Sequence, residues 1–400
     1  MSDKKLKIGI IGVGSRGVNA FAVPISQRDD AEVVALSDPN EFRMKANSKK
    51  IAGEQRFYQS EIEMLKAEKL DAVVITSPDF YHAENAVNAL NAGVHVLLDK
   101  PLATTVKGCK AIMAAAEKSG KSPMIGFNLR HNLVLKRLKE IIDAGTLGRI
   151  FIMENREFYN GGRTYMARWN RKYAISGGLW IHKGSHDFDI FNWLLNFPKP
   201  TKVTAFAGID VLNPENLPFE TEAGKKVGPN CRQCAYKSVC KDRYDIEDDP
   251  EWSNEAAEED GYYKDLCIYM SDKDVHDNGI AIVEYANGVK ASHLECFITS
   301  VDDRRYTIVG TLGQAEVSLT DRTIKICPRW SKETILHNIP DVEGGHGGAD
   351  PGLIDAFLDV VKGNSSNSST AEHGMLSTAI GQAAEISRRE ERMVKMDELI

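Results

Sequence analysis

A short stretch near the middle of the chain holds two histidines, a lysine and two aspartates. Residues 177–189 read Gly-Gly-Leu-Trp-Ile-His-Lys-Gly-Ser-His-Asp-Phe-Asp. If a helix begins just after Lys183, then His182 and Lys183 lie on the loop that enters it. His186 and Asp189 are then three residues apart and share one helix face. Because imidazole titrates near a pKa of ~6.5, such density suits proton transfer. The stretch predicts an acid–base site in which His182, Lys183 and His186 are all candidate bases.

Lys100 stands at a position where ligands are commonly bound. Residues 94–98 (Val-His-Val-Leu-Leu) predict a buried strand, and Asp99-Lys100-Pro101 follows at once. In an open α/β sheet, ligands bind outside the carboxyl ends of the strands. We therefore expect the amine of Lys100 to face a bound ligand; the alternative is a solvent-exposed lysine beside a turn proline.

The N-terminal region carries a glycine-rich turn that is typical of dinucleotide binding. A predicted strand at 6–11 leads directly into Gly12-Val13-Gly14-Ser15-Arg16-Gly17, and a helix is expected over 18–28. The glycines permit a tight turn, close approach of a pyrophosphate and close packing of helix on strand. The helix N-terminus offers unpaired N–H groups to the phosphates.

An acidic residue after the second strand favours NAD over NADP. Asp38 lies 21 positions beyond Gly17, at the end of a predicted strand over 32–37. Its carboxylate would accept hydrogen bonds from ribose hydroxyls and would repel a 2′-phosphate. Arg16 weakens this preference, since its guanidinium could pair with such a phosphate. The alternative is a glycine-rich turn without a ligand.

Strands and helices alternate over the first third of the chain. Further strands are expected at 71–75 and 94–98, and further helices at 82–92 and 104–119. This alternation predicts a doubly wound parallel sheet, that is, an NAD-binding Rossmann domain of the α/β class, over about residues 1–126.

The pattern changes over residues 127–400, which we expect to form a second, α+β domain. Short turns join most of its strands, which predicts a large, mostly antiparallel sheet that is open on one face. The predicted strands are 149–158, 201–208, 278–285, 289–298, 305–309, 312–319 and 323–327. Helices are expected at 184–195, 351–362 and 371–390, and the last two could pack back on the Rossmann domain. We expect the acidic segment 241–265 to be a solvated excursion and 363–370 to be a flexible connector.

Composition excludes several classes of protein. Of the 400 residues, 42% are apolar and 27% are charged, as in a packed protein. The formal net charge of −7 argues against a surface built to bind nucleic acid. No stretch approaches the roughly 20 apolar residues that span a membrane, and the first residues do not read as a secretory signal. We therefore expect a cytoplasmic protein with reduced cysteines.

Four of the seven cysteines are spaced like metal ligands. Cys231 and Cys234 are separated by two residues, Cys240 follows after five more, and Cys267 is distant. Four thiolates suit tetrahedral zinc, although the last two spacings are irregular. The pattern predicts a structural zinc site; the alternative is a set of free thiols in a loop.

Several motifs taken together resemble the Gfo/Idh/MocA family, which is named for glucose–fructose oxidoreductase and inositol 2-dehydrogenase. The resemblance covers nearly the whole chain. Residues 9–17 are similar to the family's N-terminal fingerprint, and Thr76-Ser77-Pro78 with His82 is similar to its Thr-Pro-Asp/Asn…His segment. Asp99-Lys100-Pro101 resembles its Glu-Lys-Pro, and residues 177–189 resemble its Gly-Gly-…-Asp-x-Gly-x-His-x-x-Asp.

The resemblance implies a role for each matching residue. Lys100 would contact the nicotinamide ribose and the substrate. His186 would act on the reacting hydroxyl as acid–base or orienter, with Asp189 in support. His182 stands where many members have an aspartate, so the identity of the base stays open. The remaining residues expected near the cofactor are Ser77, Pro78, His82 and Asp99.

Other residues are candidates for the substrate pocket. Arg130 fits either substrate binding or a structural ion pair. The side chains of Tyr159, Arg163 and Trp169 could line a sugar pocket or belong to the core. His346 precedes a predicted helix, where similar family loops approach the substrate.

We therefore expect an NAD-dependent oxidoreductase that moves hydride between the nicotinamide and a secondary hydroxyl of a sugar, glycoside or cyclitol. One alternative is an NAD-dependent glycosidase that oxidises C3 transiently and then eliminates. Another is a catalytically silent NAD or sugar sensor. The open sheet face favours a homodimer or homotetramer.

Overall fold

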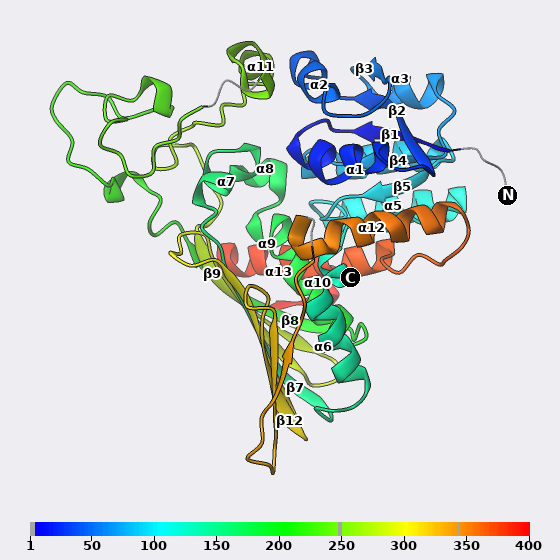
Figure 1. Cartoon of the computed structure of the whole chain (residues 1–400). Coiled ribbons are helices and arrows are strands. Elements are labelled where there is room, and N and C mark those ends of the chain that lie inside the picture. Colours follow the sequence, from blue (N-terminus) through cyan, green and yellow to red (C-terminus); the bar gives the residue numbers. More distant parts are fainter. Residues whose placement is uncertain (1–4, 247–249, 343–344) are drawn as a thin grey trace.

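Two β-sheets organise the chain, one in each half (Figure 1). The computed structural model describes residues 5–246, 250–342 and 345–400. The first sheet has six strands in the order β3-β2-β1-β4-β5-β6, and the second has nine in the order β14-β13-β12-β11-β7-β10-β9-β8-β15. A Rossmann sheet and a mostly antiparallel second sheet were both predicted, and both are confirmed.

The first sheet is parallel throughout. Its central strands are apolar along their length because helices cover both faces. The strands are β1 (Leu6–Ile11), β2 (Ala31–Ser37), β3 (Arg56–Tyr58), β4 (Ala72–Ile75), β5 (His95–Leu98) and β6 (Met124–Ile125). The helices are α1 (Val23–Ser26), preceded by the π-helical turn Arg16–Ala22, then α2 (Glu41–Ser48), α3 (Glu61–Ala67), α4 (His82–Asn91) and α5 (Val106–Ser119). The sequence reading missed β3, β6, α2 and α3, which are short elements with weak hydrophobic periodicity.

The second sheet is antiparallel except where β7 pairs with β10. Its strands are β7 (Ile150–Phe158), β8 (Pro200–Gly208), β9 (Asn278–Tyr285), β10 (Lys290–Cys296), β11 (Asp303–Gly310), β12 (Gly313–Ser318), β13 (Thr323–Pro328), β14 (Ile335–Asn338) and β15 (Val394–Lys395). The helices of this half are α6 (Leu133–Asp143), α7 (Gly162–Met166), α8 (Tyr173–Ser176), α9 (Leu179–His182), α10 (Ser185–Leu194), α11 (Asn254–Asp260), α12 (Gly345–Val361) and α13 (Ala371–Glu390).

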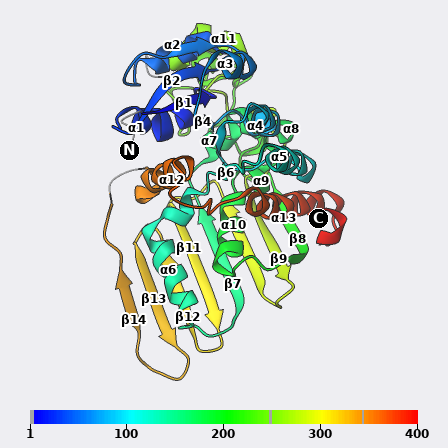
Figure 2. The same cartoon turned by 90° about the vertical axis from the view of Figure 1, so that its right-hand side faces the viewer.

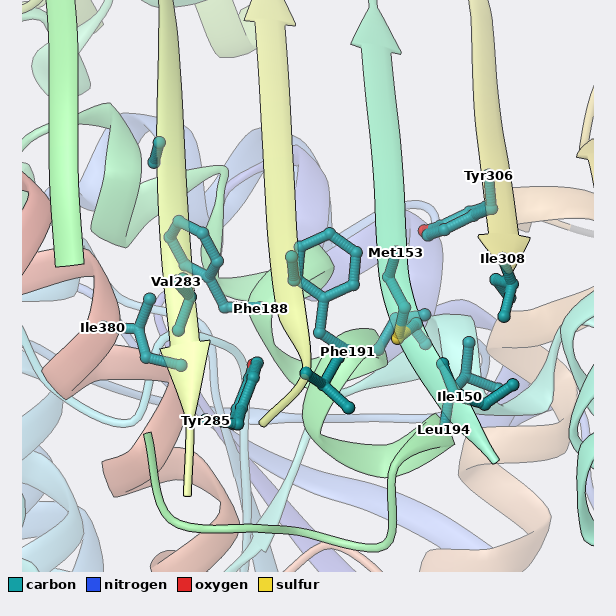
Figure 3. Packing of buried hydrophobic residues seen from close by; sticks show 14 of the residues in the cluster. Ile150, Met153, Phe188, Phe191, Leu194, Val283, Tyr285, Tyr306, Ile308 and Ile380 are labelled. Atoms are coloured by element: carbon teal, nitrogen blue, oxygen red, sulfur yellow. The ribbon is translucent and has the colours of Figure 1, made fainter. Parts of the chain in front are cut away.

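Helices cover only one face of the second sheet (Figures 1 and 2). Phe188, Phe191 and Leu194 of α10 pack on core residues of the strands, among them Val283 and Ile308 (Figure 3). The strand residues of this core are buried because successive side chains of a strand alternate between the helix-covered face and the open face. The same covered face also carries buried polar side chains on β7 and β10, namely those of Asn155, Glu157, His293 and Glu295.

Helix α12 begins at Gly345, not near residue 351 as predicted. Proline is common in the first turn of a helix, but here Pro351 lies inside the helix, which begins six residues before it. The predicted loop around residue 346 is therefore part of the helix. Leu353 and Phe357 of α12 pack into the hydrophobic core of the first sheet.

The acidic segment 241–265 was expected to be solvated; residues 241–243 and 258–261 are exposed, but the prediction is wrong at the buried positions 251, 252, 256, 257 and 265. Trp252 is 9% exposed and Ala256 is fully buried. The segment includes α11, which lies beside α2 of the first domain (Figure 1). Among the described helices, none is both long enough and apolar enough to cross a membrane.

Candidate active site

The glycine-rich turn has the local geometry that a dinucleotide needs. Gly12 has a φ of +88°, and a Cβ there would lie 2.4 Å from the backbone nitrogen of Ser77. A Cβ on Gly17 would lie 2.3 Å from the carbonyl oxygen of Gly12. A Cβ on Gly14 would meet no atom within 4 Å. The first and third glycines thus permit close packing, while the second borders open space where a pyrophosphate can approach the backbone.

Asp38 is held at the end of β2 by backbone donors. The N–H of Val13 donates to one carboxylate oxygen (2.8 Å), and the N–H of Asn40 donates to the other (2.9 Å). Burial raises the pKa of Asp38, and these two hydrogen bonds oppose that rise. The residues of this turn therefore fit a dinucleotide, and the carboxylate of Asp38 is held beside the turn by the N–H of Val13.

Arg16, a candidate phosphate ligand, is engaged by two carboxylates. Its guanidinium pairs with Asp99 (3.0 Å) and Asp350 (3.2 Å) and stacks on the ring of Phe21. Burial would lower the pKa of Arg16, but the two carboxylates outweigh it and raise the value. Arg16 thus ties the glycine-rich turn to β5 and to α12 in this structure.

The segment after β4 packs between the glycine-rich turn and the β5 end. The hydroxyl of Thr76 donates to the carbonyl of Gly12 (2.7 Å). The two ring nitrogens of His82 lie 2.9 Å from the carbonyl oxygen of Ser77 and 2.7 Å from that of Pro101. His82 therefore links the loop that carries Ser77 and Pro78 to the loop that carries Asp99 and Lys100.

Lys100 reaches across the junction between the two domains. Its Nζ donates to the backbone carbonyl of His182 (2.5 Å). Burial lowers the pKa of Lys100 to about 8, against the opposing effect of nearby Asp79 and Asp99. A lysine in this state can change charge near neutral pH, as acid–base chemistry requires.

The ring of His182 is held by side chains from both domains. Nδ1 lies 2.7 Å from Oδ2 of Asp79, and Nε2 lies 3.0 Å from Nδ2 of Asn170. Because the amide donates to Nε2, the ring proton sits on Nδ1 and is donated to Asp79. Burial lowers the pKa of His182, against the raising effect of Asp79. The rings of Trp169 and Tyr165 meet His182 edge-on.

Lys183 is held as a cation. Its Nζ lies 2.7 Å from Oε1 of Glu157 and stands over the ring of Tyr159, 4.8 Å from its centroid. Burial would lower the pKa of Lys183, but Glu157 outweighs it and raises the value. Arg304 bridges Glu157 (2.5 Å) and Asp187 (3.0 Å). Of the three candidate bases, Lys183 is thus the one that geometry disfavours.

His186 is the second residue of α10, and it is 8% exposed. Its backbone N–H donates to the carbonyl of Lys183 (3.3 Å). Lys100, which donates to the carbonyl of His182, thus contacts the chain four residues before His186. Asp189, on the next turn, makes a bidentate ion pair with Arg130 (2.8 and 2.5 Å). Because Arg130 and Asp189 neutralise each other, this geometry favours a structural role for both over substrate binding.

The other predicted pocket residues fall into different places. Tyr159 and Trp169 lie against Lys183 and His182, as described above. Arg163 instead turns to the insertion between β8 and β9, where it donates to the carbonyl oxygens of Leu266 (3.1 Å) and Asp242 (2.5 Å). The side chain of His346 lies outside the described residues.

The four cysteines of the predicted zinc site line one small hollow of about 20 Å³. All are free thiols, and Sγ of Cys231 accepts the N–H of Tyr244 at 3.4 Å. Nevertheless, no three or more His, Cys, Asp or Glu side chains among the described residues are arranged as a metal centre. The zinc prediction is therefore not supported by this geometry.

Sequence reasoning missed several residues that shape the site. Asp79 directly follows Ser77-Pro78, so its place in that motif was the available signal. Glu157 lies two residues after Asn155 on the buried face of β7, and a charged residue on such a face signals a partner. No local signal indicates Arg304, because its partners Glu157 and Asp187 are distant in sequence. Asn170 is 12 residues from its partner His182, but no motif marks it.

Comparison with known proteins agrees with the fold. The sequence model of the Gfo/Idh/MocA oxidoreductase family, NAD-binding Rossmann fold, matches residues 6–127, and that of its C-terminal alpha/beta domain matches 139–396. The WlbA dehydrogenase from Bordetella pertussis, solved in complex with NADH and UDP-GlcNAcA, superposes with a TM-score of 0.70 at 20% identity, covering 98% of this chain and 99% of that one.

Curated relatives are oxidoreductases. An oxidoreductase named YteT from Bacillus subtilis is 30% identical over 97% of both chains. Inositol 2-dehydrogenase from Salmonella typhimurium is 30% identical over 55% of this chain and 65% of its own. D-glucoside 3-dehydrogenase from Escherichia coli is 31% identical over 51% and 58%. From the two family matches and the full-length relative, we conclude that the chain belongs to the Gfo/Idh/MocA family of NAD-binding oxidoreductases.

Proposed function

We propose that this chain is an NAD-dependent dehydrogenase acting on a secondary hydroxyl of a sugar, glycoside or cyclitol. The observation that supports this most is the contact of Lys100 with the His182 segment. It joins the carboxyl end of β5 to the acid–base cluster of the second domain. The relatives named for inositol and D-glucoside oxidation support the substrate class.

In the proposed reaction, one residue stabilises the charge that develops on the substrate and another residue accepts the hydroxyl proton. When bound, the cofactor supplies the hydride acceptor or donor. In the oxidation direction, the ammonium of Lys100 stabilises the negative charge that develops on the substrate oxygen. A histidine takes the hydroxyl proton, and His182 and His186 are the candidates. Asp79 supports His182 by accepting its Nδ1 proton and fixing the ring. Lys183 keeps its charge and orients its surroundings.

We further propose that NAD is preferred over NADP. Asp38 presents a carboxylate at the ribose end, where a 2′-phosphate would be repelled. Arg16 offers little to such a phosphate while Asp99 and Asp350 hold its guanidinium.

A substrate panel tests the proposal. Purified full-length protein is incubated with NAD and a library of sugars, cyclitols and glycosides, and NADH absorbance and aglycone release are followed together. We expect NADH to accumulate with at least one member and Lys100→Ala to abolish it. Aglycone release without net NADH would instead identify the redox-neutral glycosidase. Tight NADH binding with no turnover on any member would favour the sensor.

We also infer that the uncovered face of the second sheet pairs with a second copy. Ile152, Phe206 and Ile282 are exposed on this face, and Phe206 is 71% exposed. A protein rarely leaves a large apolar face in water. Light scattering should give a dimer or tetramer, and Phe206→Glu should shift it toward the monomer; a monomeric wild type would refute the pairing.

A further inference from the structure

The insertion between β8 and β9 returns to the first domain at the edge of the cofactor site. Its helix α11 lies beside α2, the helix that follows Asp38 and Asn40 (Figures 1 and 2). The side-chain amide of Asn40 donates to the carbonyl of Ala256 (2.7 Å) and to Asp260 (2.9 Å). The insertion is thus anchored two residues from the carboxylate that is expected to bind the ribose.

Arg43 is fully engaged by this insertion. Its guanidinium pairs with both carboxylate oxygens of Asp260, and its Nε donates to the carbonyl of Glu251 (3.2 Å). The rings of Trp252 and Tyr262 stack on the guanidinium at 5.3 and 5.2 Å. Arg43 is the cation of α2 nearest in sequence to Asp38, and such an arginine could have received a 2′-phosphate. Here its charge is already balanced by Asp260.

Glu251 brings a second carboxylate to the glycine-rich turn. Its Oε1 lies 3.1 Å from the hydroxyl of Ser15, and its Oε2 lies 3.6 Å from Nζ of Lys50. Glu251 is only 2% exposed. Ser15 belongs to the turn that borders the phosphates, and the N–H of Val13 in the same turn binds Asp38. Glu251 and Asp38 therefore approach the same end of the site from two domains.

We propose that Glu251 is a cofactor-specificity residue, which with Asp38 selects a dinucleotide whose ribose carries a free 2′-hydroxyl. The insertion of the second domain forms one wall of the cofactor site. This inference deepens the proposed NAD preference and rests on NAD binding at the glycine-rich turn.

The selection works mainly by repulsion. A 2′-phosphate carries up to two negative charges and would meet the carboxylates of Asp38 and Glu251 in a partly buried place, where charge interactions are strong. Compensation by Arg43 would require breaking its pair with Asp260, and compensation by Lys50 would require drawing its ammonium away from Glu251. Discrimination against one ligand by like charge is a common route to specificity. A ribose hydroxyl, in contrast, donates hydrogen bonds to carboxylates.

Equilibrium titration of NADH and NADPH into the full-length protein, followed by nicotinamide fluorescence, tests the role of Glu251. The variants are Glu251→Gln, Asp260→Asn and the control Glu258→Gln, an exposed residue of α11. We expect Glu251→Gln to reduce the NADPH-to-NADH ratio of Kd values by roughly tenfold, since it removes one charge. Asp260→Asn should reduce the ratio through a released Arg43, and the control should leave it unchanged.

The ratio of the two Kd values distinguishes a role of Glu251 in cofactor specificity from a role in anchoring the insertion. If Glu251 only anchored the insertion, Glu251→Gln would weaken both dinucleotides equally, and an unchanged ratio overturns the inference. Asp260→Asn tests a separate part of the inference, namely that the insertion holds Arg43 away from a 2′-phosphate. If Glu251→Gln fails to fold, Glu251→Ala takes its place, and an unchanged ratio there overturns the inference equally. A wild-type protein that binds neither dinucleotide would contradict the proposed function itself.

Discussion

Two partly buried lysines lie near the domain junction, and their pKa values are shifted in opposite directions from the ordinary lysine value. Lys100, at the end of a parallel strand, donates to a backbone carbonyl, and burial lowers its pKa to about 8. Lys183, which directly follows α9, pairs with the carboxylate of Glu157, which outweighs burial and raises the pKa of Lys183. The difference lies in the partner, because a neutral carbonyl compensates a buried charge far less than a carboxylate does. The first lysine is therefore suited to chemistry and the second to holding the site together.

Removing the charge at Lys100 should give the largest effect on turnover. We expect Lys100→Met to lower kcat by about 10³-fold, because the negative charge that develops on the substrate oxygen loses its ammonium partner. NADH should still bind, as fluorescence titration can show. Lys118→Met, on the exposed side of α5, is the matched control and should keep wild-type kcat. Near-normal turnover in Lys100→Met would remove this lysine from the chemistry.

Removing the charge of Glu157, the ion-pair partner of Lys183, should lower the free energy of unfolding. Glu157→Gln leaves Lys183 and Arg304 less well compensated in a buried place and should cost about 3 kcal/mol of unfolding free energy, measured by urea denaturation at neutral pH. Glu154→Gln, in a half-exposed pair with Arg156 on the same strand, should cost less than about 1 kcal/mol. Burial raises the pKa of Glu157, but Arg304 and Lys183 outweigh it and lower the value. This stability is therefore present above the ordinary glutamate pKa, and the gap between wild type and Glu157→Gln should shrink as pH falls below it. An equal cost for both substitutions would contradict the contrast between the lysines.

A substitution in the Asp79–His182 pair tests whether His182 or His186 accepts the substrate proton beside Lys100. Asp79→Asn replaces the carboxylate beside Nδ1 with a neutral amide, whose NH2 can donate to Nδ1 and favour the other ring tautomer. We expect kcat to fall about 10²-fold with little change in NADH affinity. His186→Gln is measured in parallel. A large loss in His186→Gln with normal turnover in Asp79→Asn would assign the proton transfer to His186 alone.

The pH profile should show the smallest effect. In the oxidation direction, kcat/KM should decline as pH rises through about 8, because the folded-state pKa of Lys100 lies there and the ammonium is the active form. Lys100→Arg keeps its charge at higher pH, so any residual activity should lack this decline. A wild-type profile that is flat from pH 7 to about 9 would mean that the charge of Lys100 does not limit turnover.

The sequence predicted those parts of the site that depend on local patterns. The strand over 6–11, the glycine turn and Asp38 follow from residue order alone, because strand, turn and helix are neighbours in the chain. Lys100 was found in the same way, from its place after an apolar run. The doubly wound sheet and the antiparallel hairpins follow from comparable local periodicities.

What the sequence could not predict depends on pairs that are distant in the chain. Lys183 was a candidate base from the sequence, but its ion pair with Glu157 of strand β7, which lies earlier in the chain, holds it as a cation. Asp260 looked like one more solvated acid, but its partner Arg43 lies 217 residues earlier. Arg130 and Asp189 were left open between substrate binding and an ion pair, and only their contact across the fold favours the pair.

The central claim is that Lys100 and the histidine segment of the second domain face the reacting end of the cofactor. A crystal structure of the full-length protein with bound NADH tests it most directly. We predict the nicotinamide ring beside Lys100, with the ring of His182 or His186 within hydrogen-bond reach of a substrate hydroxyl placed about 3–3.5 Å from the nicotinamide. A nicotinamide bound on another face, with Lys100 and both histidines out of reach, would contradict it.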